Sequence, residues 1–261
     1  MPPNVLSIAG FDPSSGAGVT ADIKTIAAHG CYGVACISAY TVQSTLGVKR
    51  VEPLSADLVL DSLGELIADV DIAAVRIGML GSASVASTVA DFLTSSRLPN
   101  VVLDPIIRSS SGASLLGPRG LEIVRERLVP LSTLVTPNID EAAMLTGLPV
   151  TSVSEMETAA ARLRHMGAAN AVVTGGHLAE PIDVLTTASG AERFAAAHIE
   201  SRSTHGTGCA FATAIACNLA NGYPVRDAVL AAKQYVREAI ENAYPVGTGT
   251  GPLNHLYRMS R

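Results

Sequence analysis

The chain has 261 residues, of which 48% are hydrophobic and 16% are charged, a balance that argues against a disordered protein. Its net charge is −5 and it contains no run of Lys or Arg, so neither a nucleic-acid nor a membrane partner is expected. No uncharged apolar stretch reaches the roughly 18 residues that span a bilayer.

Short apolar runs, mostly β-branched and bounded by Gly, Pro or Asp, predict buried strands. In chain order these runs are Val5–Ala9, Val34–Ala39, Ala74–Ile77, Val101–Leu103, Leu134–Thr136 and Ala171–Thr174. Helical periodicity fits Val19–His29, Ala56–Ala68, Ala83–Leu93, Glu122–Leu128, Glu141–Leu145, Glu155–Met166, Cys209–Ala220 and Arg226–Ala243. This alternation predicts an α/β fold with a mostly parallel central sheet and helices on both faces.

Local signals refine this prediction. Ile182–Thr187 and Arg193–Ile199 have no helix between them, which predicts a small antiparallel addition to the sheet. Capping boxes are expected at Ser154 with Glu157 and, in a looser form, at Asn138 with Glu141. No linker, repeat or low-complexity tract divides the chain, so one domain over residues 1–261 is the simplest expectation.

Ligands of open α/β sheets bind beyond the carboxyl ends of the strands, and polar residues gather there in this sequence. The predicted strand ends are followed by Gly10–Gly18, Gln43-Ser44-Thr45, Gly78-Met79, Asp104-Pro105, Asn138 with Glu141, and Gly175-Gly176-His177. The Gly10–Gly18 loop matches neither a P-loop nor GxGxxG, so the alternative to a nucleotide-binding loop is a plain strand–helix connection.

A second glycine-rich turn, Ser203–Cys209, leads directly into an apolar helix. Converging backbone amides and the positive end of the helix suit a bound anion, most often a phosphate. The helix end would also lower the pKa of Cys209. The alternative is an ordinary connection with Cys209 as a small core residue.

Several single residues allow both a functional and a structural interpretation. Asp104 and Glu141 could hold Mg²⁺, or could serve a turn and a helix cap. Gln43 offers a donor and an acceptor to a heteroaromatic ring, or is an exposed loop amide. Met79 could pack on a ring or in the core. The same ambiguity applies to Asp22, Lys233, His177 and His205.

The four cysteines, Cys31, Cys36, Cys209 and Cys217, show no CxxC pair and no zinc-ligand spacing. They predict free thiols in a reducing compartment. The N-terminal residues have neither the basic region nor the apolar run of a signal peptide. We therefore expect a cytoplasmic protein.

Together these segments resemble the vitamin-kinase branch of the ribokinase superfamily, and most closely the hydroxymethylpyrimidine/phosphomethylpyrimidine kinases of thiamine biosynthesis. The resemblance runs from about residue 5 to residue 244. The matching segments are Ala9–Gly18, Ala21–Thr25, Thr41–Val48, Ile77–Leu80, Leu103–Ile107, Thr136–Ala142, Gly175–His177, Asp183–Leu185 and Thr204–Cys209. The last is the most specific, because most of the superfamily has Asp where this chain has Cys209.

The resemblance implies ATP-dependent phosphorylation of 4-amino-5-hydroxymethyl-2-methylpyrimidine, and commonly of its monophosphate in the same site. Gly206, Thr207, Gly208 and Cys209 would form the anion hole, with Cys209 beside the substrate hydroxyl. The implied substrate contacts are Gln43, Asp22, Met79, Gly10 and Ile107. The implied nucleotide contacts are Asn138, Thr174, Lys233 and Thr204, and Asp104 and Glu141 would organise Mg²⁺, with Asn138 beside them.

One departure from the family pattern is Thr174, where most members have Lys before Gly-Gly-His. Lys233 or a metal ion could supply the missing positive charge. Two alternatives stay open: a pyridoxal or pyridoxine kinase on the same fold, and a vitamer sensor without turnover. The resemblance also suggests a homodimer.

Overall fold

The computed structural model describes residues 1–108, 112, 115–176 and 181–259. The strands are β1 (Asn4–Phe11), β2 (Tyr32–Ser44), β3 (Gly47–Pro53), β4 (Ala74–Ile77), β5 (Val101–Leu103), β6 (Leu134–Val135), β7 (Ala171–Val173), β8 (Ile182–Thr187) and β9 (Gly190–Ala195). The α-helices are α1 (Gly18–Ala28), α2 (Ala56–Asp69), α3 (Ala83–Ser96), α4 (Pro118–Ile123), α5 (Ile139–Thr146), α6 (Val153–His165), α7 (Thr207–Ala220) and α8 (Val225–Glu241).

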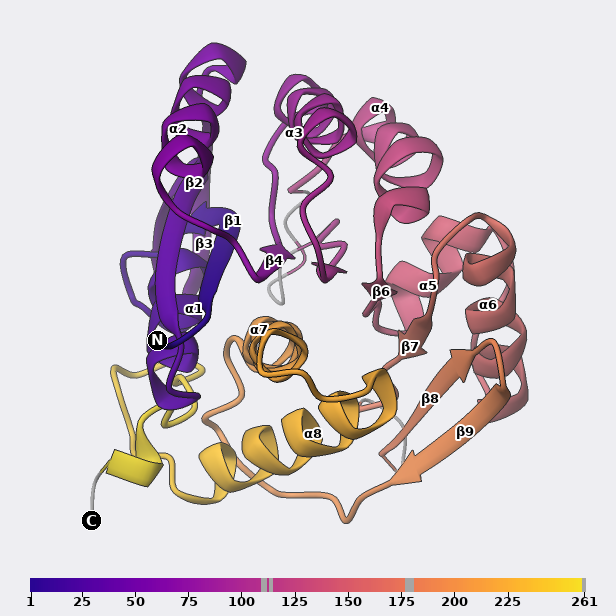
Figure 1. Ribbon diagram of the computed structural model, residues 1–261. Coiled ribbons are helices and arrows are strands. Elements are labelled where there is room, and N and C mark those ends of the chain that lie inside the picture. Colours follow the sequence, from indigo (N-terminus) through magenta and orange to yellow (C-terminus); the bar gives the residue numbers. More distant parts are fainter. Residues whose placement is uncertain (109–111, 113–114, 177–180, 260–261) are drawn as a thin grey trace.

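These strands form one nine-stranded sheet in the order β3-β2-β1-β4-β5-β6-β7-β8-β9 (Figure 1). The central strands β2, β1, β4, β5, β6 and β7 pair in parallel with their neighbours in this order. The outer strands β3, β8 and β9 pair antiparallel to their neighbours. The expected α/β fold with a mostly parallel sheet is therefore confirmed.

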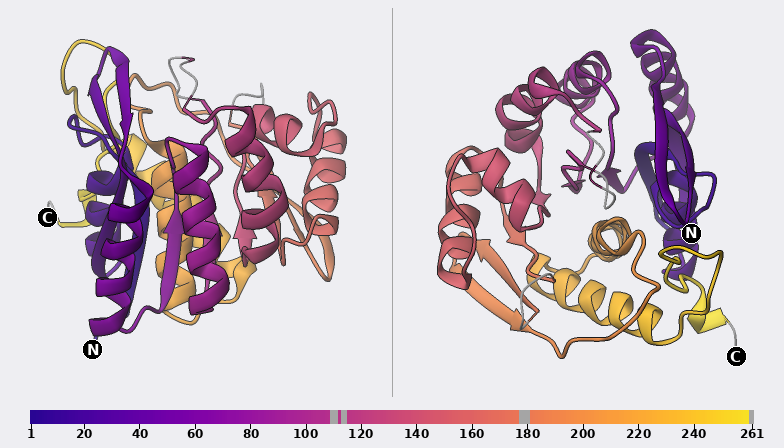
Figure 2. Two further views of the ribbon diagram at one scale, coloured as in Figure 1. Left: turned by 90° about the horizontal axis from the view of Figure 1, so that it is seen from above. Right: turned by 180° about the vertical axis from the view of Figure 1, so that it is seen from behind.

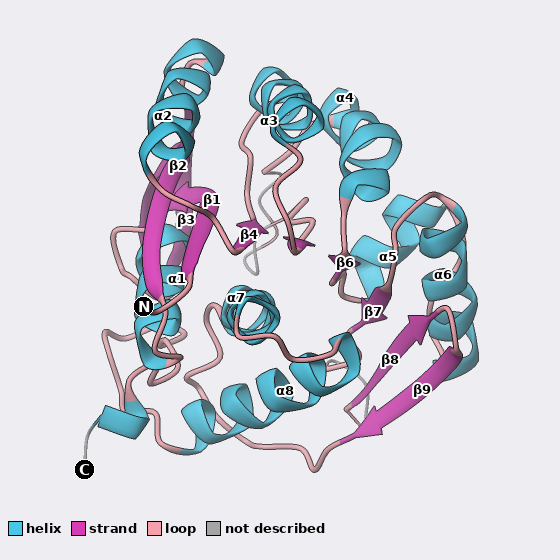
Figure 3. Ribbon diagram, in the orientation of Figure 1, coloured by secondary structure: helices cyan, strands magenta, loops and turns pink. Residues whose placement is uncertain are grey.

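Helices cover both faces of the sheet (Figures 2 and 3). On one face, Leu6, Ile8 and Val75 pack in a core with side chains of α2 to α6. On the other, Val5 and Ala74 pack against α1, α7 and α8. Neighbouring strand residues thus point to opposite cores, as the two-residue period of a strand requires. No helix in the described ranges is long and apolar enough to cross a bilayer.

The structure corrects several predicted boundaries. Strand β2 continues to Ser44 and returns as β3, a strand that we did not predict because Lys49 and Arg50 break its apolar pattern. The capping box of α6 uses Ser152 and Glu155, whereas Glu157 pairs with Arg193.

Two further boundaries differ. Strand β9 begins before the predicted range, and α4 continues as a π-helix over Val124–Leu128. The box at Asn138 and Glu141 is confirmed.

Candidate active site

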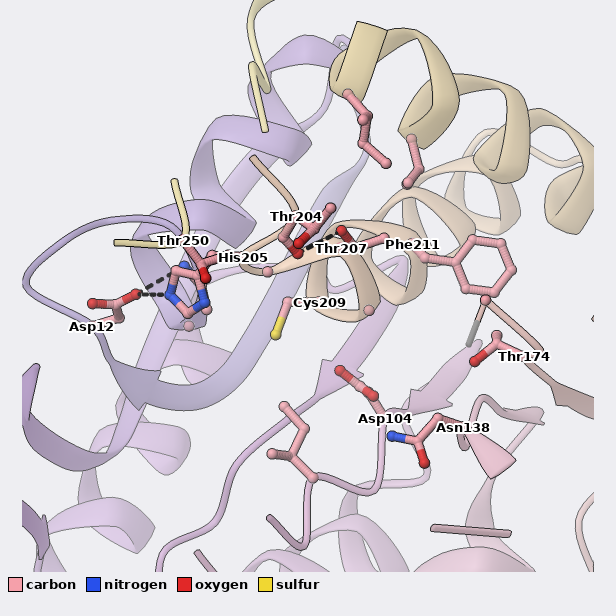
Figure 4. Close-up of a pocket in the computed structure, with 18 of the residues that line it drawn as sticks. Asp12, Asp104, Asn138, Thr174, Thr204, His205, Thr207, Cys209, Phe211 and Thr250 are labelled. Carbon is pink, nitrogen blue, oxygen red and sulfur yellow. Dashed lines mark hydrogen bonds and ion pairs between the residues drawn. The ribbon is translucent and has the colours of Figure 1, made fainter. Parts of the chain in front are cut away.

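A cavity of about 1150 Å³ lies at the carboxyl ends of the parallel strands. Strand ends, the β2–β3 hairpin, the start of α7, the segment between β9 and α7, and one side of α8 all contribute to its wall. Of the expected site residues, those that line it are Gly10, Gln43, Met79, Asp104, Asn138, Glu141, Thr174, Thr204, Gly206, Thr207, Gly208, Cys209 and Lys233. Figure 4 shows part of this wall, with the Cys209 sulfur on the side where Asp104 and Asn138 lie.

The start of α7 presents unpaired amides to this cavity. Gly206 precedes the helix in the left-handed region at φ +80°, and a Cβ there would come within 1.8 Å of the Gly16 carbonyl oxygen. Within the described part of the chain, the backbone N–H groups of Gly208 and Cys209 donate to no acceptor. Free amides at the positive end of a helix are a site for an anion such as a phosphoryl group.

The Cys209 thiol lies beneath these amides and is only 7% exposed. Burial raises its pKa to about 12, although the nearby Arg76 guanidinium opposes the shift. The expected lowering of this pKa is therefore wrong. A helix end contributes about 0.3–1 kcal/mol at exposed positions, whereas complete burial shifts a pKa by up to several units. At neutral pH Cys209 is a thiol that can donate a hydrogen bond.

Arg76 is fully buried below the thiol and joins two carboxylates. Its Nη1 lies 3.1 Å from Asp22 Oδ2, and its Nη2 lies 2.6 Å from Asp104 Oδ2. Sequence reasoning missed Arg76. The available signal was a single charged residue in the short apolar strand β4, because such a charge is buried only with a partner.

Asp22 does not reach the cavity, so the expected substrate contact is corrected. Its side chain is fully buried and accepts hydrogen bonds from Ser7 Oγ at 2.6 Å and Thr213 Oγ1 at 2.7 Å, besides its pairing with Arg76. Asp22 thereby ties α1 to β1, β4 and α7. Its role is to hold Arg76 and α7 in place beneath the site.

Ile107 is also corrected, because its side chain belongs to the core between the sheet and α2–α6. The preceding residue, Ile106, lines the cavity instead. Ile107 packs in the core and Ile106 faces the cavity, and the sequence alone offered no reason to choose between the two neighbouring isoleucines. His177 lies outside the described residues.

Asp104 and Glu141 line the same part of the cavity. Burial raises the pKa of Glu141 to about 8, and the negative charge of Asp104 adds to this shift. Burial likewise raises the pKa of Asp104, while Arg76 opposes the effect. The described residues contain no group of three or more His, Cys, Asp or Glu arranged to hold a metal ion. Among these described residues, Asp104 and Glu141 are thus a pair of interacting carboxyl groups without a third side-chain ligand of this kind.

Gln43, an expected substrate contact, is held within the β2–β3 hairpin rather than in a free loop. Gly10 and Met79 are in close contact, since a Cβ on Gly10 would come within 2.2 Å of Met79 Cε. Met79 is only 7% exposed, so it is a core methionine with its edge on the cavity.

On the opposite side of the cavity, Lys233 is not a solvent-facing lysine. Its Nζ lies 2.5 Å from Asp183 Oδ2, and Asp183 Oδ1 accepts from the Gly175 amide at 3.1 Å. This places an ammonium group beside the turn that begins at Thr174, where the family usually carries its own Lys.

Asp12 and His205 form a further pair in the cavity wall. His205 Nε2 lies 2.8 Å from Asp12 Oδ2 and 3.1 Å from Gln43 Nε2. Asp12 was not among the expected site residues, although its position directly after β1 was a usable signal.

Comparison with known proteins identifies relatives over most of the chain. The model of the family "Phosphomethylpyrimidine kinase" matches residues 12–254. The hydroxymethylpyrimidine/phosphomethylpyrimidine kinase of Streptomyces coelicolor is 42% identical over 97% of this chain and 94% of its own length. The thiamine biosynthesis bifunctional protein ThiED of Geobacter sulfurreducens is also 42% identical over 97% of this chain. The present chain spans about half (52%) of that bifunctional protein.

Solved structures show the same fold. The ADP complex of Bacillus subtilis pyridoxal kinase has a TM-score of 0.91 at 31% identity and covers 100% of both chains. A phosphomethylpyrimidine kinase of Clostridium difficile has a TM-score of 0.82 at 34% identity, covering 91% of this chain and 99% of its own.

Proposed function

Because the chain belongs to the phosphomethylpyrimidine kinase family, we propose that it transfers a phosphoryl group from ATP to the hydroxymethyl group of 4-amino-5-hydroxymethyl-2-methylpyrimidine, and then to its monophosphate. The observation that carries the proposal is the position of the Gly208 and Cys209 amides beside the Cys209 thiol, in the cavity that Gln43 also lines.

Phosphoryl transfer passes through a loose transition state, so positioning and charge stabilisation dominate catalysis. The amides of Gly208 and Cys209 stabilise negative charge on the moving phosphoryl group. Cys209 hydrogen-bonds the acceptor hydroxyl and orients it. Because burial raises the pKa of Cys209 to about 12, the side chain is a neutral thiol at neutral pH and not a thiolate base. Gln43 hydrogen-bonds to the edge of the pyrimidine ring, and Met79 packs near the face of this ring.

The nucleotide lies on the Thr174 side of the cavity. Asn138, Thr174 and Thr204 line this region, and Lys233 supplies the positive charge that Thr174 lacks. Asp104 and Glu141 fit Mg²⁺, which commonly binds one or two carboxylates together with waters and substrate phosphates. The ion would neutralise phosphate charge and relieve the repulsion between these two carboxyl groups.

A second candidate is phosphorylation of pyridoxal, favoured by the close structural match to a pyridoxal kinase. Both functions can be tested by the release of ADP from Mg-ATP. The release is measured separately with the hydroxymethylpyrimidine, with its monophosphate and with pyridoxal. We expect a higher kcat/KM for the pyrimidine than for pyridoxal. The reverse order would select the second candidate, and ligand binding without ADP release would indicate a vitamer sensor.

We further propose a homodimer in a reducing compartment. Exposed apolar side chains on the β2–β3 hairpin, Ile37, Val42 and Leu46, support self-association, and all four cysteines are free thiols. The mass in solution from light scattering tests the dimer, which a monomeric mass would contradict.

A further inference from the structure

We propose that Asp12 and His205 fix the orientation of the Gln43 side-chain amide, and so determine the order in which the pocket presents a hydrogen-bond donor and an acceptor to the substrate ring. The inference rests on the proposed function in one respect, namely that Gln43 contacts the ring. It makes Asp12 and His205 positioning residues for substrate selection.

Both residues are held rigidly. Asp12 is 3% exposed and accepts hydrogen bonds from Ser14 N at 2.8 Å, Ser14 Oγ at 2.7 Å and Ala17 N at 3.0 Å. The His205 amide donates to the Gly251 carbonyl at 3.0 Å, and its ring packs so closely on Gly16 that a Cβ there would come within 2.2 Å of Cδ2. Figure 4 shows the Asp12 carboxylate directed at the His205 ring.

A single ring nitrogen lies between two neighbours with conflicting demands. His205 Nε2 is 2.8 Å from Asp12 Oδ2 and 3.1 Å from Gln43 Nε2. If Nε2 carries no proton, it accepts a hydrogen bond from the Gln43 amide, but its lone pair then repels the oxygen of the Asp12 carboxylate. If Nε2 carries a proton, it donates a hydrogen bond to Asp12, but its N–H group then repels the N–H group of Gln43.

The carboxylate decides this conflict. Burial opposes ionisation of Asp12, but its pKa is lowered, and the Ser14 amide, the Ser14 hydroxyl and the Ala17 amide donate to its carboxylate independently of His205. An ionised carboxylate only accepts, so Nε2 carries a proton whether the ring is neutral or cationic.

The Gln43 amide then turns its carbonyl oxygen to His205 and its NH₂ group to Thr41 Oγ1. The Thr41 hydroxyl lies 3.2 Å from the other end of the amide and donates to the Phe11 carbonyl at 3.0 Å, which leaves an oxygen lone pair for that NH₂ group. The two ends of an amide are alike in size, so hydrogen bonding selects between the orientations.

This orientation has a consequence for the substrate. In either orientation one N–H and one lone pair of Gln43 are used internally, and one of each is left for the cavity. A flip therefore keeps the number of hydrogen bonds but exchanges their order. A 4-aminopyrimidine has an acceptor nitrogen beside a donor NH₂, whereas its 4-oxo analogue has a donor N–H beside an acceptor oxygen. The substrate of the proposed function is the amino ring, so we infer that the orientation fixed by Asp12 and His205 is the one that matches an amino ring rather than an oxo ring.

Nitrogen-15 NMR of the histidine rings tests the first step on the whole chain without turnover. The His205 signals are assigned by their loss in His205→Gln. We expect a proton on Nε2 in the wild-type protein. A bare Nε2 would overturn the inference.

The second step, selection between an amino and an oxo ring, is tested by dissociation constants. They are measured for two 5-hydroxymethyl-2-methylpyrimidines, one with a 4-amino group and one with a 4-oxo group. In Asp12→Asn nothing requires a proton on Nε2, so both amide orientations become populated. We expect the amino preference of the wild type to fall about tenfold or more, because an unpaired buried polar group is strongly disfavoured. The control Asp91→Asn alters only an exposed pair with Arg127 and should keep the preference.

An unchanged preference in a folded Asp12→Asn would contradict the inference. Binding of neither pyrimidine by the wild type would instead refute the proposed function and, with it, the selection of an amino ring. The NMR result separates these failures, since it reports the Asp12–His205 arrangement alone.

Discussion

At the scale of single residues, the proposed chemistry depends on what Cys209 can do as a neutral thiol. An alcohol loses its proton late in a loose phosphoryl transfer, so a hydrogen bond that fixes the hydroxyl can replace early deprotonation. In the proposed mechanism, the neighbouring amides of α7 stabilise the negative charge of the phosphoryl group. Cys209 and these amides therefore make separable contributions.

Cys209→Ala should lower kcat by roughly 10²–10⁴-fold, the usual range for a positioned proton-handling group. The fold should persist because one small apolar residue replaces another. Cys209→Ser should retain more activity than Cys209→Ala, since a hydroxyl also donates to the substrate. Steady-state kinetics and melting temperatures check this expectation. Equal kcat in wild type and Cys209→Ala would remove the thiol from the mechanism.

Arg76 gives a prediction about stability. In Arg76→Met, Asp22 and Asp104 would remain buried without their counter-charge. Breaking a buried ion pair in this way costs about 3–5 kcal/mol of unfolding free energy. In the control Arg127→Met, an exposed pair with Asp91 is lost, which costs about 1 kcal/mol or less. Denaturant titration of both variants compares them. Equal losses would contradict the proposed role of Arg76.

At the scale of elements, the site is closed by a contact between two distant segments. The C-terminal segment Pro245–Gly251 crosses the tip of the β2–β3 hairpin, where the Thr250 amide donates to the Thr45 carbonyl at 2.9 Å. The next residue, Gly251, accepts from the His205 amide at 3.0 Å. This strap connects the β2–β3 hairpin, which carries Gln43, to the turn before α7.

Gly249→Ala should disturb this connection, because its Cβ would come within 2.0 Å of the Thr45 carbonyl oxygen. Overpacking typically costs about 1–3 kcal/mol, and relief requires movement of the hairpin tip. We expect KM for the pyrimidine to rise while KM for ATP changes less. Gly64→Ala in α2 meets no atom within 4 Å and is the matched control. Parallel changes in both KM values would argue against a local effect of the strap.

At the scale of the whole molecule, one buried histidine links stability to pH. His255 is 2% exposed, and burial lowers its pKa to about 3 from an ordinary value of 6.5. Between these values the unfolded chain binds the additional proton. The stability contributed by neutral His255 is therefore complete above pH 6.5 and declines as the pH falls.

His255→Gln should consequently lose less unfolding free energy on acidification than the wild type. The difference in slope should approach about 1.4 kcal/mol per pH unit between pH 6 and 4. Denaturant titrations at several pH values provide the measurement, with the exposed His165→Gln as control. Parallel curves for wild type and His255→Gln would contradict the prediction.

The sequence predicted the sheet, its helices and most of the cavity wall, because strand ends and glycine turns leave local signals. It could not show Arg76 between two carboxylates, since that network joins β4, β5 and α1 through burial alone. Burial also reversed the predicted pKa shift of Cys209. The orientation of Ile106 against Ile107 and the closure of the hairpin by the C-terminal strap likewise depend on tertiary contacts.

The central claim is that α7 begins at the point of phosphoryl transfer. A crystal structure with a non-hydrolysable ATP analogue, Mg²⁺ and the hydroxymethylpyrimidine tests it most directly. We expect the terminal phosphate to accept hydrogen bonds from the Gly208 and Cys209 amides, with the substrate hydroxyl beside the Cys209 sulfur. A terminal phosphate bound elsewhere in the cavity would contradict the account.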